Sequence, residues 1–136
     1  EQMHDARIIP IFASATEARA NRRPEVLQQY MGDSVGWYEG DALVVETINV
    51  NPQQMQQSST AITKNGRITE RFTRYSDTEI VYRFTVEDSD LYSQAWTAEL
   101  SFHTSDGHLY EYACHEGNYS MPGTLAGARR LEAEQK

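Results

Sequence analysis

The sequence predicts a mainly β fold, in which an antiparallel meander closes as a small lipocalin-like barrel or a rolled sheet. Apolar and polar residues alternate in many segments, which is the period of a half-buried strand. Short turn signals separate these segments, so neighbouring strands are expected to pair as hairpins. A chain of 136 residues can form one domain that buries roughly two thirds of its unfolded surface. We therefore expect a single β domain over residues 1–136.

Seven segments carry the strand signal. The expected strands are, in order, 3–12, 41–50, 59–64, 67–75, 79–87, 95–103 and 109–115. The first is apolar and β-branched, and Pro10 indicates an edge or a bend there. Residues 13–23 lack a clear apolar stripe and are expected to form an exposed loop or a frayed helix. Pro24 suits the first position of a short helix over 24–31.

The middle of the chain is expected to contain a loop and a tight hairpin. Residues 31–41 are punctuated by three glycines and indicate a structural loop between the helix and the next strand. Asn65-Gly66 is the strongest hairpin signal, because a type I′ turn needs positive φ at both central residues. We expect this turn to fix the register of the strands on either side.

The later strands show the clearest alternation. Phe84 and Trp96 lie on the apolar phase of two of them, which predicts that both side chains lie in the main core. After the last strand, Pro122 and Gly123 precede a small-residue helix over 124–134. The prediction is thus a β domain with two short helices.

Composition and charge exclude several partners. The formal charge of −8 argues against binding to nucleic acid or to an anionic membrane, since phosphate binding needs a basic stripe. No apolar run approaches the roughly 20 residues that span a bilayer, so we expect no membrane insertion. A single cysteine excludes an internal disulfide framework. The chain starts at Glu1 without Met, and we expect it to begin inside a longer precursor, after a removed leader or an upstream segment.

The segment 110–119 brings together an acid, a base and the single thiol of the chain. It contains Glu111, Cys114, His115 and Glu116. Glu and His on a strand among aromatic residues bear a desolvation cost unless they line a site. Cys114 directly precedes His115, and neighbouring strand residues point to opposite faces, so an inert thiol is expected.

The first hypothesis is a small-molecule enzyme that uses acid–base chemistry, of the lyase, isomerase or hydrolase type, on a carbohydrate-like or aromatic metabolite. The first and last strands of a meander are its natural closing partners, which would bring His4 to His115. The candidate catalytic residues are His4, His115, Glu111, Glu116, Glu99 and Arg71. Arg71 would steady an anion. His4, His115 and Glu116 are also candidate metal ligands, but the chain has no established metal or nucleotide motif, so the cofactor stays open.

Two other classes remain open. One is a non-catalytic barrel that binds a small apolar ligand among Trp37, Tyr82, Trp96 and Tyr112. The other is a structural module of a larger assembly, with its sheet edges paired in a homodimer. If the sheet stays open, the mid-strand carboxylates form only its wet face. Buried His and Glu around a cavity would favour catalysis, and an apolar cavity would favour binding.

Several motifs resemble those of a large family of uncharacterised exported proteins from environmental bacteria. The most specific is Met-Gly-Asp-Ser…Glu-Gly-Asp-x-Leu-Val-Val-Glu-Thr, at 31–34 and 39–47. The others lie at 1–10, 70–74, 85–88, 96–100 and 110–119. Tyr38 stands where the family pattern has Trp, and Ala95 where it has Pro. The resemblance implies export to the periplasm or the outside and implies no activity.

Overall fold

The computed structural model describes residues 6–53, 60–107 and 119–134. The chain divides into two compact units, one over 6–106 and one that combines 107–136 with 1–5.

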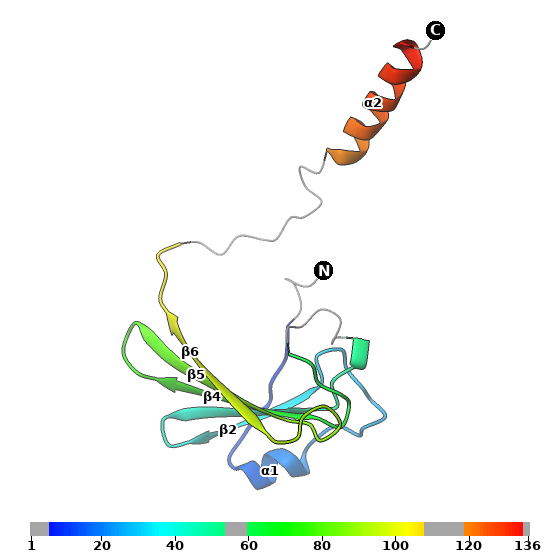
Figure 1. Cartoon of the computed structure of the whole chain (residues 1–136). Helices are drawn as coiled ribbons and strands as arrows, with labels where there is room; N and C mark the ends of the chain where they lie inside the picture. The colour runs from blue at the N-terminus through cyan, green and yellow to red at the C-terminus, as the bar shows by residue number, and fades with distance from the viewer. Residues whose placement is uncertain (1–5, 54–59, 108–118, 135–136) are drawn as a thin grey trace. The chain divides into compact units, whose positions relative to one another are not determined.

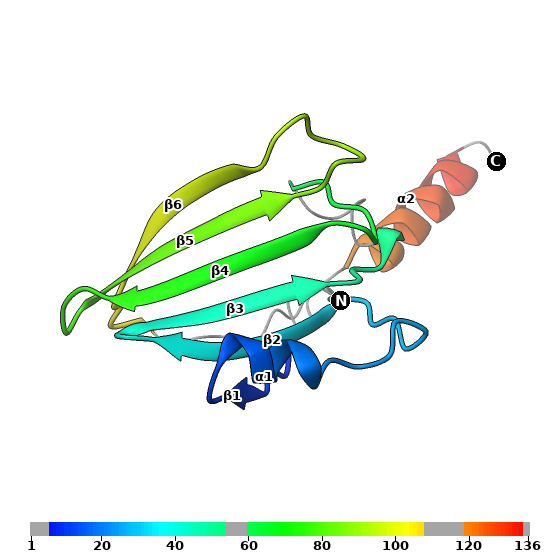
Figure 2. The ribbon, with the colours of Figure 1, turned by 90° about the horizontal axis from the view of Figure 1, so that it is seen from below.

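The larger unit contains one six-stranded sheet whose strands follow the order of the chain (Figure 2). The strands are β1 (Ile11–Phe12), β2 (Asp33–Glu39), β3 (Ala42–Ile48), β4 (Arg67–Arg74), β5 (Glu79–Glu87) and β6 (Trp96–His103). β1 is parallel to β2, and every other neighbouring pair is antiparallel. This confirms the mainly β, antiparallel prediction. The sheet is open among the described residues, with β1 and β6 at its edges, so closure into a barrel stays a prediction.

The two faces of the sheet differ in character. Cross-strand partners lie on the same face, as Tyr82 does with Phe72 on β4 and Leu100 on β6. We call the face that carries Tyr82 the ring face. Its residues on β4 to β6 are Ile68, Glu70, Phe72, Arg74, Ile80, Tyr82, Phe84, Val86, Trp96, Ala98, Leu100 and Phe102. The opposite face is the helix face, on which α1 (Ala15–Ala20) packs near β1 and β2 (Figure 1).

A helix lies within 13–23, where the sequence indicated a loop or a frayed helix. Ser14 caps α1 by accepting a hydrogen bond from the backbone of its first turn. Ala18, the buried residue of this helix, packs in one cluster with Val35 and Trp37. Because the contacts are made by small residues, Ala15 and Ala18, α1 has no stripe of large apolar side chains that sequence periodicity could reveal.

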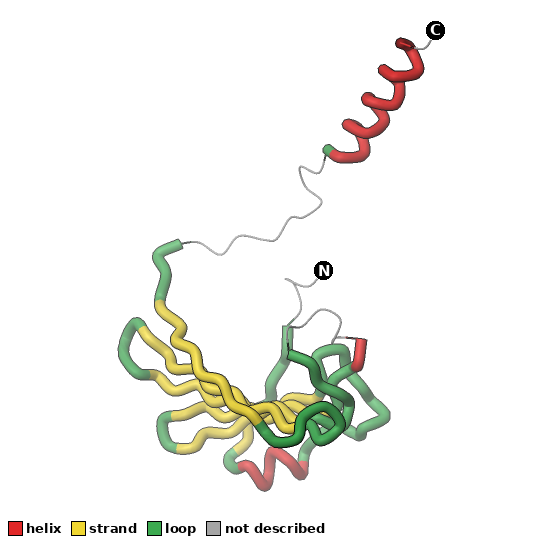
Figure 3. Tube along the Cα trace, viewed as in Figure 1, coloured by secondary structure: helices red, strands yellow, loops and turns green. Residues whose placement is uncertain are grey.

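The helix predicted over 24–31 is wrong. These residues form turns and irregular structure, drawn as loop in Figure 3. A single bond from the Leu27 amide to the Pro24 carbonyl marks one turn, and Val26 and Leu27 are exposed. A short helix is marginal unless it buries an apolar face, and this segment buries none.

The glycine-punctuated region 31–41 is a strand, β2, with tight turns at its ends. Gly32 and Gly40 have positive φ angles of 79° and 59°. Gly40-Asp41 forms the two-residue connection to β3, with positive φ only at the glycine, as a type II′ turn requires. Gly36 lies within the strand, where a Cβ atom would come 2.7 Å from the Ile11 Cδ1 atom. The glycines thus allow turns and close packing around a strand.

The type I′ turn predicted at Asn65-Gly66 is also wrong, since neither residue has positive φ. The turn is closed by the Gly66 amide, which donates to the Thr63 carbonyl at 3.1 Å. Residues 60–64 are not a strand, and Arg67 pairs with Ile48 of β3 and with β5. The turn therefore leads into β4 and does not join two paired strands. Tertiary pairing has overridden the local signal.

A second core cluster lies on the ring face. Val50, Ile62 and Val86 are buried there, and Phe84 and Trp96 are half-buried and pack against them. The two aromatic residues predicted for the core thus lie at its border. Their rings meet edge to face at 5.5 Å between centroids.

Other predicted elements have different bounds in the structure, and some are shorter and some longer than predicted. Of the predicted strand 3–12, only Ile11–Phe12 forms a strand among the described residues. The C-terminal helix α2 (Ser120–Glu134) begins earlier than predicted and buries none of its residues. The strand predicted at 109–115 lies outside the described residues. No described helix is long and apolar enough to cross a bilayer.

Candidate functional site

Most of the predicted catalytic residues lie outside the described ranges. They are His4, Glu111, His115 and Glu116. The predicted ligand contact Tyr112 also lies outside these ranges. The shared His4–His115 site therefore stays a prediction. Among the residues that the structure describes, no group of three or more His, Cys, Asp or Glu side chains could hold a metal ion.

The two described members of the catalytic set lie on the face opposite the rings. Arg71 on β4 pairs with Glu39 at 2.6 Å, and Glu99 on β6 pairs with Arg83 at 2.7 Å. Both pairs are substantially exposed to solvent. These separate cross-strand ion pairs are typical of a solvated sheet face, and such pairs add little stability.

The predicted ligand contacts divide between the two faces. Tyr82 and Trp96 lie on the ring face, whereas Trp37 is buried on the helix face. Trp37 donates from Nε1 to Glu39 at 2.8 Å, and the Arg19 guanidinium lies 5.4 Å from its ring centroid. Trp37 therefore belongs to the packing beneath α1 and not to a surface shared with Tyr82.

A ladder of stacked rings crosses the ring face. The Tyr82 ring lies 4.8 Å from that of Phe72 on β4 and 5.2 Å from that of Phe102 on β6, measured between centroids. It also lies 5.6 Å from the ring of Phe84, two residues along the same strand. The ladder is bordered by two exposed apolar side chains, Ile80 on β5 and Leu100 on β6, and Phe102 within it is also exposed. Stacked rings that keep an exposed apolar border are suited to contact an apolar partner.

A compact polar cluster lies beside the ladder. Glu70 on β4 is only 5% exposed. Arg7 binds it through two parallel bonds of 2.6 and 3.0 Å, and the Tyr82 hydroxyl donates to it at 2.9 Å. Arg7 also donates to the Thr47 hydroxyl at 3.2 Å. The segment ahead of β1 therefore lies against the ring face, while α1 covers the opposite one.

This cluster holds fixed charges. Burial raises the pKa of Tyr82 well above its usual range, and the neighbouring Glu70 carboxylate adds to the effect. The hydrogen bonds from Arg7 to Glu70 raise the pKa of the guanidinium. Tyr82 therefore stays protonated and Arg7 stays charged at neutral pH, and Arg7 neutralises Glu70. A bidentate pair of this kind positions groups but does not transfer protons.

A second buried carboxylate, Glu46 on β3, serves the fold on the helix face. Arg19 contacts it at 2.8 Å and Arg22 at 2.6 Å, and Arg22 also reaches Asp33 at 3.3 Å. Burial opposes the ionisation of Glu46, but the bonds from Arg19 and Arg22 outweigh burial and lower its pKa. The cluster ties α1 and the segment after it to β2 and β3.

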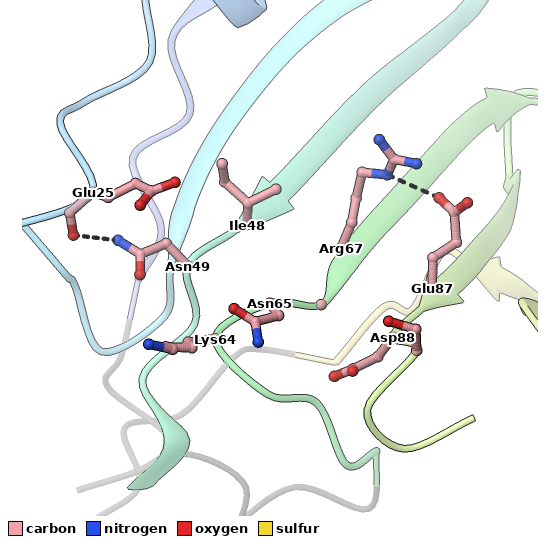
Figure 4. Close-up of a pocket in the computed structure, with 10 residues that line it drawn as sticks. Glu25, Ile48, Asn49, Lys64, Asn65, Arg67, Glu87 and Asp88 are labelled. Carbon is pink, nitrogen blue, oxygen red and sulfur yellow. Dashed lines mark hydrogen bonds and ion pairs between the residues drawn. The ribbon is translucent and has the colours of Figure 1, made fainter. Parts of the chain in front are cut away.

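A polar pocket of about 580 Å³ lies at one end of β3 to β5 (Figure 4). Its lining includes Asn49, Lys64, Arg67 and Glu87. Arg67 is paired with Glu87 at 2.8 Å, and Lys64 and Arg67 point in different directions in the close-up. The charged groups do not converge on one point, so the pocket is a weaker candidate than the ring face.

Comparison of the chain with protein-family models, with curated proteins and with solved structures finds no match. The family resemblance of the motifs therefore stays a prediction. Among the described residues, the ring face is the strongest candidate for a functional site.

Sequence reasoning identified part of this face and missed the rest. Tyr82 and Trp96 are among the predicted ligand contacts, whereas Glu70 is not among the predicted site residues. Phe72 and Phe102 share the apolar phase of their strands, which was the available signal for the ladder. Nothing in the sequence indicates that Arg7 reaches Glu70, 63 residues away.

Proposed function

We propose that the protein binds a small apolar ligand on its ring face without catalysing a reaction. The observation that carries the proposal is the ladder of Phe72, Tyr82 and Phe102, bordered by exposed Leu100 and Ile80. A monomeric protein rarely leaves contiguous apolar surface uncovered unless the surface has a binding role.

The charges on the ring face support binding over acid–base chemistry. General acid–base catalysis needs a group that exchanges protons near the working pH. Arg7 and Glu70 are paired, and Tyr82 is held protonated. The enzyme hypothesis depends instead on the histidines at 4 and 115, outside the described residues. If the sheet closes as the sequence predicts, the ladder would line the interior of a barrel, where an apolar ligand would be shielded from water.

The test uses N-phenyl-1-naphthylamine, a neutral probe whose fluorescence rises in an apolar environment. The parent protein is expected to bind the probe saturably at one site. Leu100→Ser should weaken binding at least about fivefold, because it removes apolar contact area worth about 1 kcal/mol or more. Leu125→Ser is the matched control, since Leu125 on α2 is 48% exposed and Leu100 is 52% exposed.

Two results would contradict the proposal. One is a parent protein that does not bind the probe. The other is an equal loss of affinity in Leu100→Ser and Leu125→Ser, which would place the probe elsewhere. Sedimentation with and without the probe separates ligand binding from a homodimer that buries the ring face, because a dimer would dissociate as the probe binds.

A further inference from the structure

We infer that the ligand of the ring face is uncharged and carries a carbonyl oxygen that Arg7 binds, while its apolar body lies on the ring ladder. This inference rests on the proposed binding function and names the class of ligand.

Tyr82 connects the apolar and polar parts of the site. Its ring is the central member of the ladder, stacked on Phe72 and Phe102. Its hydroxyl donates to Glu70 at 2.9 Å, and the same carboxylate oxygen accepts a bond from Arg7 at 3.0 Å. A ligand that covers the Tyr82 ring therefore lies beside the Arg7–Glu70 pair.

The polar cluster has hydrogen-bond donors to spare. A guanidinium has five N–H groups. The described residues accept three hydrogen bonds from Arg7: two at Glu70 and one at Thr47. The Arg7 side chain is 25% exposed, so part of it is accessible to a ligand on the ring face. Trp96 has another unpaired donor among the described residues, but its Nε1 atom is buried and faces no open surface. The site therefore favours an oxygen acceptor near Arg7.

The charge of the cluster selects an uncharged acceptor. The Arg7 Nη1 atom lies 2.6 Å from the Glu70 Oε2 atom, and the charges of the two side chains neutralise each other. A carboxylate on the ligand would approach Arg7 only beside the buried charge of Glu70, on a protein with a formal charge of −8. Removing that carboxylate from water would also carry a large desolvation cost. A ketone or similar carbonyl accepts the same hydrogen bond without either penalty.

The experiment compares three naphthalenes of similar size as competitors of the bound probe. They are 2-acetylnaphthalene, which has a neutral carbonyl, 2-ethylnaphthalene, which has none, and 2-naphthoate, which is an anion. On the parent protein the ketone should displace the probe at about tenfold lower concentration than the hydrocarbon, as a hydrogen bond to a charged group predicts. The anion should be the weakest competitor.

Two variants assign the preference to the cluster. Glu70→Gln keeps the Arg7 donors and removes the opposing charge, so the ketone should keep its advantage and 2-naphthoate should improve at least about tenfold. The double variant Arg7→Met with Glu70→Gln leaves no unpaired buried charge, and it should bind the ketone and the hydrocarbon equally. Far-UV spectra and urea midpoints check that both variants fold.

The outcomes separate the two claims. If the probe binds the parent and responds to Leu100→Ser, but the ketone and the hydrocarbon compete equally, the carbonyl inference is overturned and the binding function stands. If the ketone advantage survives in the double variant, Arg7 is not its source and the inference is also overturned. If the probe does not bind, both claims fall.

Discussion

Replacing Arg22 by Met tests whether the cluster on the helix face holds the fold together. The Arg22 guanidinium donates to the carbonyl of Asp33 at 2.9 Å and to the carboxylate of Glu46 at 2.6 Å. The Arg22 side chain is 12% exposed, and those of Glu46 and Asp33 are 5% and 8% exposed. Met keeps much of the apolar stem but none of the donors, so the substitution isolates the polar contribution.

The expected loss of stability depends on which buried charges are left without a partner. Removing one partner of a buried pair costs about 3–5 kcal/mol. Arg19 continues to bind Glu46, so we expect about 3 kcal/mol for Arg22→Met, at the lower end of that range. Arg19→Met should cost about 1 kcal/mol, because the Arg19 side chain is 53% exposed and Arg22 would still neutralise the carboxylate. Arg74→Met is the surface control, since Arg74 pairs with a solvated Asp77, and it should cost at most about 0.5 kcal/mol.

Urea unfolding followed by the near-UV signal measures all three variants against the parent at pH 7. Equal m-values are needed before the midpoints are compared, because a changed slope means a changed unfolded or native state. If Arg22→Met and Arg19→Met lose the same stability, the different burial of the two arginines does not decide their contributions. The account of the cluster would then be wrong.

Three further predictions concern stability. Gly66→Val should lower the free energy of unfolding by at least about 1 kcal/mol, because a Cβ atom there would meet Ile62 and lie 2.7 Å from the Asp88 Oδ2 atom. An unchanged urea midpoint would contradict this close packing. Trp96→Ala should cost about 3 kcal/mol, as expected for a half-buried ring at the core border, and a loss below about 1 kcal/mol would mean that its contacts contribute little. The lowered pKa of Glu46 stabilises the fold above the ordinary Glu pKa of about 4.3, and this contribution disappears as the pH falls through the lower pKa of the folded state. Glu46→Gln should therefore be less stable than the parent at pH 7, and the difference should shrink towards pH 3; a constant difference would contradict the linkage.

The strands of the second half of the sheet could be predicted from the sequence because each buries one face along its length. The strand predicted at 79–87 is β5, and that predicted at 95–103 contains β6. Alternation reports this burial directly, since successive side chains point to opposite faces. The ring face was therefore accessible from the sequence as an apolar phase.

In the first half of the sheet, the strand predicted at 41–50 contains β3, but β2 and α1 could not be predicted in the same way. β2 is buried over Asp33–Trp37 without alternation, and it contains a glycine that local rules assign to loops. α1 is held by Ala18 and by the pairing of Arg19 with Glu46, 27 residues away. Short-range patterns do not report contacts at such separations, because the register that creates them is set by the whole sheet.

The same limit applied to the polar part of the site. Arg7 meets Glu70 only because the segment ahead of β1 lies on the ring face, and that path depends on the pairing of β1 with the edge of β2. Sequence analysis could place Glu70 on an apolar phase, but it could not supply the partner that neutralises it. The binding hypothesis could be reached from the sequence, whereas the polar partners beside the rings could be located only in the folded chain.

The exposed part of the ring face allows binding to be separated from folding. On the helix face, Glu46 and Trp37 are buried in contacts that the fold needs, so substitutions there should lower stability first. On the ring face, Leu100 and Phe102 keep about half of their surface in solvent, and each contributes less to folding than a buried residue of its size. An apolar ligand would cover the exposed half. Substitutions at these two positions should therefore weaken ligand binding by more than they lower the free energy of unfolding, which is the pattern of a surface maintained for a partner.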